Sequence, residues 1–413
     1  MIFIALPRSV LIRRVGEDRF LISDLRNGLF KLDFKSLVIY LNSVGEYDEL
    51  KIWERVRKYV DIEFEAFCNT LERMIQKQIL ILRKKFDENP FRVEPIIDRA
   101  RRPFSGVEAI SIQTLGISVT GKCPYRCKGC YRACPNENPE LEVEAFFPFI
   151  EEAATYGCKY VNITGGEPTY GEAVDRGLRI AKKTVELGMK CVMVTSGWEL
   201  AENINKFKKY ICGVQLSLDG LKEYHNAYRG REDAWERAIR AIRACKEAKV
   251  PVWINCVVTP NNMDMLETFY KYLIDIGVSK IRFSPLFPEG RACGSYELDL
   301  EFYERVIKRI EELHVLMHGE AIEIEGDRLY CDAGTTQLYL MENGDVYLCP
   351  FIPKIFGNVT KNSFTQIWQN RSLDLFRNGI YPESTCLNCK YRKTCFNGCF
   401  AMYFIRKEVC PFV

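Results

Sequence analysis

The chain has 413 residues, of which 47% are hydrophobic and 12% aromatic, enough apolar material for about two or three buried cores. Its 58 Lys and Arg residues nearly balance 55 Asp and Glu residues, which leaves a net charge of +3. This small excess gives no strong electrostatic case for a nucleic-acid partner. Because no apolar run reaches membrane-spanning length and the first residues do not resemble a signal peptide, we expect a soluble, cytoplasmic protein with no membrane partner.

Residues 1–85 combine strand and helix patterns. Apolar strands are expected at Ala5–Val15 and Arg19–Leu25, and apolar residues recur at helical spacing between residues 37 and 75, before a closing strand at Ile79–Leu82. This order predicts a small winged-helix-like domain. The charged, Pro-containing segment 86–109 lacks clear periodicity, and we interpret it as a linker.

Residues 110–318 alternate between short apolar strands and helical segments of a dozen or more residues. Such β/α repeats form a parallel sheet with helices outside, either an open barrel or a doubly wound layer. Ligands then bind at the carboxyl ends of the strands. The six expected strands are Leu115–Val119, Tyr160–Ile163, Cys191–Val194, Val214–Leu218, Val252–Val258 and Lys280–Phe283.

Two groups of closely spaced residues stand out among the 18 cysteines, and in a cytosolic chain such groups are more often metal ligands than disulfide partners. The first follows the first expected barrel strand and reads Cys123-Pro-Tyr-Arg-Cys127-Lys-Gly-Cys130. Three thiolates on one tight loop suit three corners of a four-iron cluster and leave the fourth iron open. A zinc site is the alternative, with Cys134 as the fourth ligand.

The aromatic Tyr131 after this motif and the Gly165-Gly166-Glu167-Pro168 segment after the second strand together resemble the radical S-adenosylmethionine (SAM) superfamily. The resemblance implies that the open iron binds the amino and carboxylate groups of SAM, and that the GGEP backbone and glutamate hold the amino group. Close backbone approach requires glycine, and a carboxylate suits an ammonium. The fold implied is a partial (β/α)6 radical SAM barrel.

Later segments of the barrel agree with this resemblance. Ser196 at the end of the third strand, and Ser217 and Asp219 at the end of the fourth, resemble family segments that line the ribose and methionine of SAM. Arg229 lies where family members often place a partner for the SAM carboxylate. Loop caps and solvated charges are the alternative interpretation of these residues, and we interpret Asn255 as an ordinary strand amide.

Residues 319–413 lose the β/α alternation and contain seven cysteines. Their spacing resembles that of the SPASM domain, a carboxyl-terminal extension of radical SAM enzymes that holds two auxiliary clusters. Disulfides or paired zinc sites are the alternatives, because spacing alone does not identify the metal. The resemblance assigns one auxiliary cluster to Cys331, Cys349 and Cys399, and the other to Cys386, Cys389, Cys395 and Cys410.

Fully ligated SPASM domains have one more cysteine soon after the first, and this chain has none between Cys331 and Cys349. The first auxiliary cluster is therefore expected to have an open iron or to be closed by a distant residue such as Cys293. Anaerobic sulfatase maturases carry an Asp directly after the second of these cysteines. Because Pro350 occupies that position here, sulfatase maturation is disfavoured.

The resemblance implies an enzyme with three [4Fe–4S] clusters that reductively cleaves SAM to a 5′-deoxyadenosyl radical, which abstracts hydrogen from its substrate. Residues 1–85 look like the peptide-recognition domain, of the pyrroloquinoline-quinone chaperone type, that is fused to maturases of ribosomally made peptides. We therefore expect a peptide or protein substrate, and a ferredoxin or flavodoxin as electron donor. One alternative is a SPASM enzyme that acts on a small molecule or tetrapyrrole or that matures a partner metalloenzyme.

A cluster-bearing DNA-binding regulator is the alternative from another functional class. Residues 1–85 contain 16 Lys and Arg against 12 Asp and Glu. This excess of positive charge is small for a domain that binds duplex DNA. The GGEP segment also has no role in such a regulator.

Overall fold

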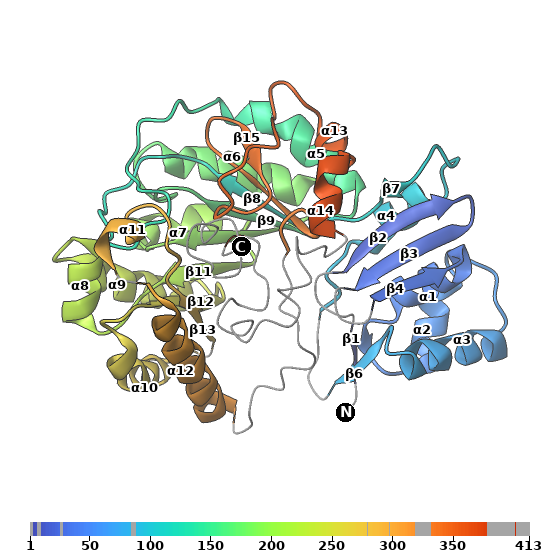
Figure 1. Cartoon of the computed structure of the whole chain (residues 1–413), viewed down its shortest axis with the longest axis horizontal. Coiled ribbons are helices and arrows are strands. Elements are labelled where there is room, and N and C mark those ends of the chain that lie inside the picture. The colour runs from blue at the N-terminus through green and yellow to red at the C-terminus, as the bar shows by residue number, and fades with distance from the viewer. Residues whose placement is uncertain are drawn as a thin grey trace.

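The computed structural model describes residues 3–5, 10–24, 28–83, 88–278, 280–296, 298–318, 332–377 and 401. Figure 1 shows an α/β unit built around a mostly parallel sheet, and beside it a smaller module formed by the N-terminal part of the chain. Among the described residues, no helix is both long and apolar enough to cross a bilayer.

In its described residues, the N-terminal module contains two antiparallel sheets and four helices. Its four-stranded sheet has the order β4-β3-β2-β7 and its three-stranded sheet the order β5-β1-β6. Asp33 caps the first helix by accepting a 2.7 Å hydrogen bond from the Ser36 backbone N–H, which satisfies one of the free donors at the helix start. The elements are β1 (Phe3–Ala5), β2 (Leu11–Gly16), β3 (Arg19–Asp24), β4 (Gly28–Leu32), α1 (Phe34–Asn42), β5 (Gly45–Glu46), α2 (Glu49–Val56), α3 (Phe64–Gln76), β6 (Ile81–Arg83), α4 (Val93–Ala100) and β7 (Glu108–Ala109).

The segment that we interpreted as a linker is largely structured. Helix α4 buries Ile96 and Ile97 in the core of the N-terminal module, and β7 pairs with β2. Of the three prolines in this segment, Pro95 lies in the first turn of α4, where the missing N–H removes no helical hydrogen bond. The module therefore extends through residue 109.

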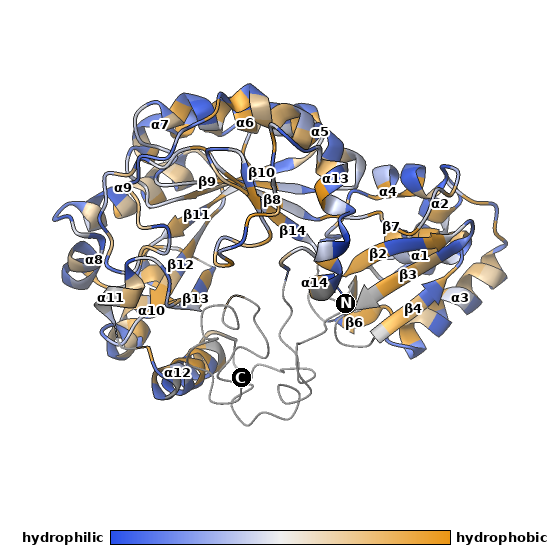
Figure 2. Cartoon of the chain, turned by 45° about the horizontal axis from the view of Figure 1, so that its top comes forward, coloured by the Kyte–Doolittle hydropathy of each residue, from blue (hydrophilic) through white to orange (hydrophobic). Residues whose placement is uncertain are grey.

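The central sheet has nine strands in the order β13-β12-β11-β10-β9-β8-β14-β15-β16. Strands β8 to β13 are parallel and follow one another in chain order. Apolar residues concentrate on this sheet and on the helix faces that pack against it (Figure 2). The elements are β8 (Thr114–Ser118), α5 (Phe147–Thr155), β9 (Tyr160–Thr164), α6 (Ala173–Glu186), β10 (Lys190–Thr195), α7 (Leu200–Phe207), β11 (Gly213–Ser217), α8 (Lys222–Arg229), α9 (Ala234–Glu247), β12 (Val252–Val258), α10 (Leu266–Asp275), β13 (Ile281–Pro285), α11 (Ala292–Ser295) and α12 (Leu300–His318), with short 3₁₀ helices at Val143–Phe146 and Met263–Met265.

The C-terminal part of the chain extends the central sheet. Strand β14 pairs in parallel with β8, placing Leu338 opposite Leu115, and β15 and β16 follow in antiparallel order. The Gln369 side chain exchanges two hydrogen bonds with the Ala109 backbone, at 2.9 and 2.8 Å, so this region also contacts the N-terminal module (Figure 1). The elements are β14 (Gln337–Leu340), β15 (Asp345–Tyr347), β16 (Gly357–Asn358), α13 (Phe364–Trp368), a 3₁₀ turn (Arg371–Leu373) and α14 (Asp374–Arg377).

Candidate functional site

A cavity of about 610 Å³ opens at the carboxyl ends of the parallel strands. Most of the residues that the sequence singled out in the barrel line it, although they come from different loops, from strand ends and, for Arg229, from the last turn of α8. Asp219 and Pro168 are not among the lining residues. Those that line the cavity are Cys123, Cys127, Cys130, Tyr131, Gly165, Gly166, Glu167, Ser196, Ser217 and Arg229.

The loop that carries Cys123, Cys127 and Cys130 is fixed through its backbone. The Lys128 N–H donates to the Tyr228 carbonyl at 2.9 Å, and the Arg291 guanidinium donates to the Cys127 carbonyl at 2.8 Å. Cys127 is buried, and Cys123 and Cys130 are half-buried. The three thiols are therefore held at the cavity wall by contacts that do not involve their sulfur atoms.

The surroundings of the three thiols affect their ionisation differently. Burial raises the pKa of Cys123 and of Cys127, whereas a hydrogen bond from the Cys134 thiol lowers the pKa of Cys130 to about 6. A bound metal deprotonates coordinating thiols outright, so Cys123 and Cys127 are suited to being metal-bound thiolates rather than free ones.

The arrangement of side chains bears on the choice between zinc and a cluster. Within the described ranges, no three His, Cys, Asp or Glu side chains converge on a point where one metal ion would sit. Zinc needs four donors about 2.0–2.3 Å from a single ion, whereas a four-iron cluster binds each cysteine through a different iron. Three cysteines on one loop suit the second of these arrangements.

The two glycines of the GGEP segment lie directly against the cysteine loop. The Gly166 N–H donates to the Thr120 carbonyl at 2.7 Å, and the Glu167 N–H donates to the Lys122 carbonyl at 3.0 Å. Any Cβ atom at position 166 would overlap the Lys122 carbonyl. Glycine is thus required here for the two backbones to approach each other.

We expect the substitution Gly166→Ala to lower the rate of 5′-deoxyadenosine formation about 100-fold, because an added methyl group must displace the cysteine loop and small displacements of a reacting site have effects of this size. Gly177→Ala in α6 is the matched control, since its Cβ would make only ordinary contacts, at 3.5 Å or more. Product quantification by chromatography checks this prediction. Equal rates in the two variants would contradict it.

Glu167 is almost fully buried, and its carboxylate is already heavily hydrogen-bonded. Oε1 accepts bonds from the Thr169 N–H and from the hydroxyls of Thr169 and Thr195. Oε2 accepts bonds from the N–H and hydroxyl of Ser196. A carboxylate offers about four acceptor positions, so Glu167 joins the ends of β9 and β10. An ammonium group at this place would have to share these oxygens or contact the neighbouring backbone.

Arg229 lies between the cysteine loop and a buried carboxylate. Its Nη2 is 2.6 Å from Asp219 Oδ2, and its Nη1 donates to Cys127 Sγ at 3.7 Å. Burial alone would raise the pKa of Asp219, but the charge of Arg229 and the neighbouring His225 lower it below its usual value. Asp219 therefore orients Arg229 from behind the cavity wall, and its predicted contact with the cofactor stays a prediction.

The Nε atom of Arg229 is buried and has no hydrogen-bond partner among the residues that the structure describes. An unpaired buried donor is costly, and this one belongs to a cation at the cavity wall. The donor set fits a carboxylate ligand such as that of SAM. The cavity thus offers an anion-binding group and three thiols. Beside them, two backbone segments approach so closely that only glycine fits at position 166.

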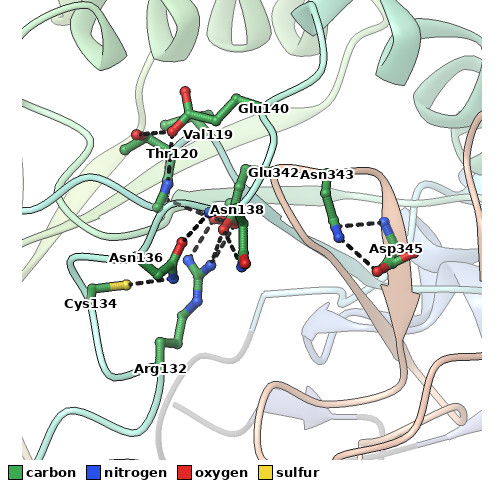
Figure 3. Close-up of polar contacts among 12 residues, drawn as sticks. Val119, Thr120, Arg132, Cys134, Asn136, Asn138, Glu140, Glu342, Asn343 and Asp345 are labelled. Atoms are coloured by element: carbon green, nitrogen blue, oxygen red, sulfur yellow. Dashed lines mark hydrogen bonds and ion pairs between the residues drawn. The ribbon is translucent and has the colours of Figure 1, made fainter.

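Several residues at this site were not identified from the sequence. Asn255 lines the cavity, where the Ser284 hydroxyl donates to its Oδ1 at 2.9 Å, so it is both a satisfied strand amide and part of the wall. Arg132 and Glu342 form a buried pair in which Nη2 is 2.7 Å from Oε1. The Ser118 hydroxyl at the end of β8 bonds to both partners. The side chains of Arg132 and Glu342 meet in Figure 3.

The Arg132–Glu342 pair joins the cysteine loop to the segment that follows β14. Aromatic packing makes a second connection, because the Phe351 ring lies 4.7 Å from Tyr131 and 4.2 Å from Phe287, measured between ring centroids. These contacts bring Cys349 to the same cavity as the first cysteine group. Neither the ion pair nor the aromatic packing could be predicted from the spacing of residues in the sequence.

The other predicted auxiliary ligands, Cys331, Cys386, Cys389, Cys395, Cys399 and Cys410, lie outside the described residues. Cys293 is exposed on α11, and its thiol donates to the Pro288 carbonyl at 2.9 Å. Pro350 lines the cavity beside Cys349. An open iron in the first auxiliary cluster stays a prediction.

Comparison with known proteins identifies two regions of the chain. Residues 117–273 match the model of the radical SAM superfamily, and residues 331–390 match that of an iron–sulfur cluster-binding domain, SPASM. These regions imply that the chain binds SAM and iron–sulfur clusters. The first match spans β8 to α10 and includes the cysteine loop, the GGEP segment and Arg229.

Relatives include enzymes with different substrates. The AdoMet-dependent heme synthase of Methanosarcina barkeri is 27% identical over 323 residues, which cover 68% of this chain and 89% of that protein. The mycofactocin maturase MftC of Mycolicibacterium smegmatis is 29% identical over 313 residues, which cover 69% of this chain and 77% of MftC.

Among solved structures, Streptococcus suis SuiB bound to its precursor peptide SuiA has a similar fold. The TM-score is 0.62 at 16% sequence identity, and the match covers 96% of this chain and 95% of SuiB. The fold likeness therefore includes the N-terminal module as well as the barrel. The chain belongs to the radical SAM superfamily, carries a SPASM domain, and is an enzyme of that family.

Proposed function

We propose that this enzyme modifies a peptide or protein substrate, as a maturase of a ribosomally made peptide. The observation that carries the proposal is the fold likeness to peptide-bound SuiB over 96% of the chain, together with a cavity in which the cysteine loop, the GGEP segment and Arg229 meet. The similarity to MftC, which is named a maturase, supports the same substrate class.

In this proposal Cys123, Cys127 and Cys130 would hold the SAM-binding cluster, and Arg229 would bind the SAM carboxylate. When bound, the reduced cluster and SAM together supply a carbon radical that abstracts hydrogen from the substrate. The chain contributes orientation: Asp219 aligns Arg229, and the Gly166 and Glu167 backbones fix the distance between the GGEP segment and the cysteine loop. The two auxiliary [4Fe–4S] clusters would use the seven cysteines of the C-terminal region.

The N-terminal module offers a place for an extended peptide. In the described part of its sheet, β4 is an outer strand that pairs only with β3, and Leu29 on this strand is 65% exposed. The free N–H and C=O groups of an outer strand accept an additional strand with little demand on the sequence that binds. A peptide held there would have a raised effective concentration at the cavity.

We expect Leu29→Glu to weaken binding of the precursor peptide at least about tenfold, because a charge would be buried beneath the added strand. Leu50→Glu on α2 is the matched control, since Leu50 is a second exposed leucine of the same module, at 55%. The probe is the short peptide encoded in a reading frame adjacent to the gene, and calorimetry measures its affinity. Equal affinities for the two variants would contradict the role of β4.

A tetrapyrrole substrate is the second candidate. It is favoured by the heme synthase of Oleidesulfovibrio alaskensis, which is 28% identical over 325 residues, in addition to the archaeal relative. An iron–sulfur DNA-binding regulator is not supported, because tight, salt-sensitive binding of duplex DNA needs a larger basic surface. Transfer of deuterium from the substrate to 5′-deoxyadenosine distinguishes a peptide substrate from a tetrapyrrole substrate.

A further inference from the structure

The segment between β13 and α11 packs directly against the cysteine loop. The Arg291 N–H donates to the Cys130 carbonyl at 3.0 Å. Just before it, Gly290 has a φ of +59°, and a Cβ atom there would lie 2.4 Å from the carbonyl oxygens of Cys130 and Tyr131. Glycine at position 290 therefore allows the Arg291 backbone to lie beside the cysteine loop.

The side chain of Arg291 makes two further contacts in the same region. Its Nε donates to the Cys127 carbonyl at 2.8 Å, and its Nη2 donates to the carbonyl of Cys134, just after the loop, at 2.5 Å. A guanidinium group is planar and always charged, so two such bonds fix the orientation of a full positive charge. Only a few covalent bonds separate the Cys127 carbonyl from its thiol, and this cation is therefore close to the three sulfur atoms.

The charge of Arg291 is not balanced in the way that its neighbours are. Arg132 is paired with Glu342, and Arg229 is paired with Asp219. Arg291 is half-buried, and it forms no ion pair with any residue in the described part of the chain. Of these three arginines at the cysteine loop, Arg291 is thus the one whose charge no described carboxylate offsets.

We propose that Arg291 raises the reduction potential of the cluster that the three cysteines would hold, and that it thereby favours the one-electron reduction that precedes SAM cleavage. The inference rests on the proposed place of that cluster. Reduction adds one negative charge beside the thiolates, and a fixed cation nearby stabilises the more negative state. Solvent and salt screen a half-buried charge less than an exposed one. Arg291 acts through the cluster, so it is a positioning residue.

Two substitutions separate the charge of Arg291 from its hydrogen bonds. Arg291→Gln removes the charge and leaves the backbone bond to Cys130 in place, whereas Arg291→Lys keeps the charge and loses the planar fork. The matched control is Arg101→Gln. Arg101 lies in the N-terminal module, where its Nη2 donates to the Tyr59 carbonyl at 2.7 Å.

The first readout is a redox titration of the reconstituted full chain with dithionite, followed by electron paramagnetic resonance. The signal that changes when SAM is added reports this cluster. At a fixed solution potential, we expect the ratio of reduced to oxidised cluster to fall at least about tenfold in Arg291→Gln, which corresponds to about 59 mV for a one-electron couple. The ratio in Arg291→Lys and in Arg101→Gln should stay near that of the wild type.

An unchanged ratio in Arg291→Gln, or an equal fall in Arg291→Lys, would overturn the proposal. Loss of about four irons from Arg291→Gln would show that the side chain only holds the loop in place, and would also overturn it. A wild type with no SAM-sensitive signal would count against the proposed cluster site and not against the role of Arg291.

The second readout compares two reductants. With dithionite, Arg291→Gln should form 5′-deoxyadenosine more slowly than the wild type, because a smaller fraction of its cluster is reduced. Titanium(III) citrate is a stronger reductant and should restore most of the lost rate. An equal deficit with both reductants would show that reduction is not the affected step, and would overturn the proposal.

Discussion

Replacing Cys123, Cys127 and Cys130 together by alanine is expected to remove about four of about twelve irons per chain and to abolish formation of 5′-deoxyadenosine. The three thiols are the cavity-lining donors of one loop, and the remaining predicted cysteines belong to the C-terminal region. Anaerobic reconstitution followed by iron quantification, with chromatography of the nucleoside product, measures both effects.

A matched variant removes three buried thiols that face the core instead of the cavity. Cys158, Cys191 and Cys245 are buried in the barrel core, and their replacement by alanine should leave the iron content and the product yield near those of the wild type. The cavity variant must lose both. If it still produced 5′-deoxyadenosine, the assignment of the SAM site to this loop would be wrong.

Arg132→Met is expected to destabilise the fold by about 3–5 kcal/mol, because it leaves the buried Glu342 carboxylate without its cation. The side chain of Glu342 is fully buried and that of Arg132 is 3% exposed. Two neutral side chains also donate to this carboxylate, Ser118 at 2.6 Å from Oε2 and Asn138 at 3.3 Å from Oε1 (Figure 3). Denaturant unfolding monitored by circular dichroism measures the change in the free energy of unfolding.

Two controls distinguish the effect of an unpaired buried charge from the effect of losing any ion pair. The double variant Arg132→Met with Glu342→Gln should recover part of the loss, because no uncompensated charge remains. Lys271→Met breaks an exposed pair with Glu267 on α10 and should cost less than about 1 kcal/mol. An Arg132→Met variant as stable as Lys271→Met would contradict the account.

The same pair predicts a pH dependence. Burial alone would raise the pKa of Glu342, but the Arg132 charge and the Ser118 hydroxyl lower it below its usual value. A carboxyl group with a lowered folded-state pKa stabilises the fold fully above its unfolded pKa, about 4.3, and loses this contribution as the pH falls through the folded value. The stability difference between wild type and Arg132→Met should therefore shrink in acid.

The barrel was predictable from the sequence because its strands are short, largely apolar segments, each with at least one buried residue. The helical segments between them mark their ends. The structure places strands at all six expected positions, with ends shifted by only one or two residues. The site residues that follow these strands were predictable for the same reason, since parallel strands bring their carboxyl ends to one edge.

Contacts between distant segments were not predictable. Glu342 pairs with a residue 210 positions earlier, and Gln369 bonds to a backbone 260 positions earlier. Helix α4 was missed because its segment is charged, contains proline and lacks clear periodicity, although a proline in the first helical turn is tolerated. In each case the structure depends on a contact between segments that are distant in the sequence, and no local sequence pattern predicts such a contact.

The most direct test of the account is deuterium transfer from substrate to 5′-deoxyadenosine. The reconstituted enzyme, SAM and dithionite are incubated with a uniformly deuterated precursor peptide or, separately, with a deuterated iron coproporphyrin, and the nucleoside is analysed by mass spectrometry. The account predicts deuterium in 5′-deoxyadenosine with the peptide and none with the porphyrin. Deuterium from the porphyrin but not from the peptide would contradict the proposed substrate class.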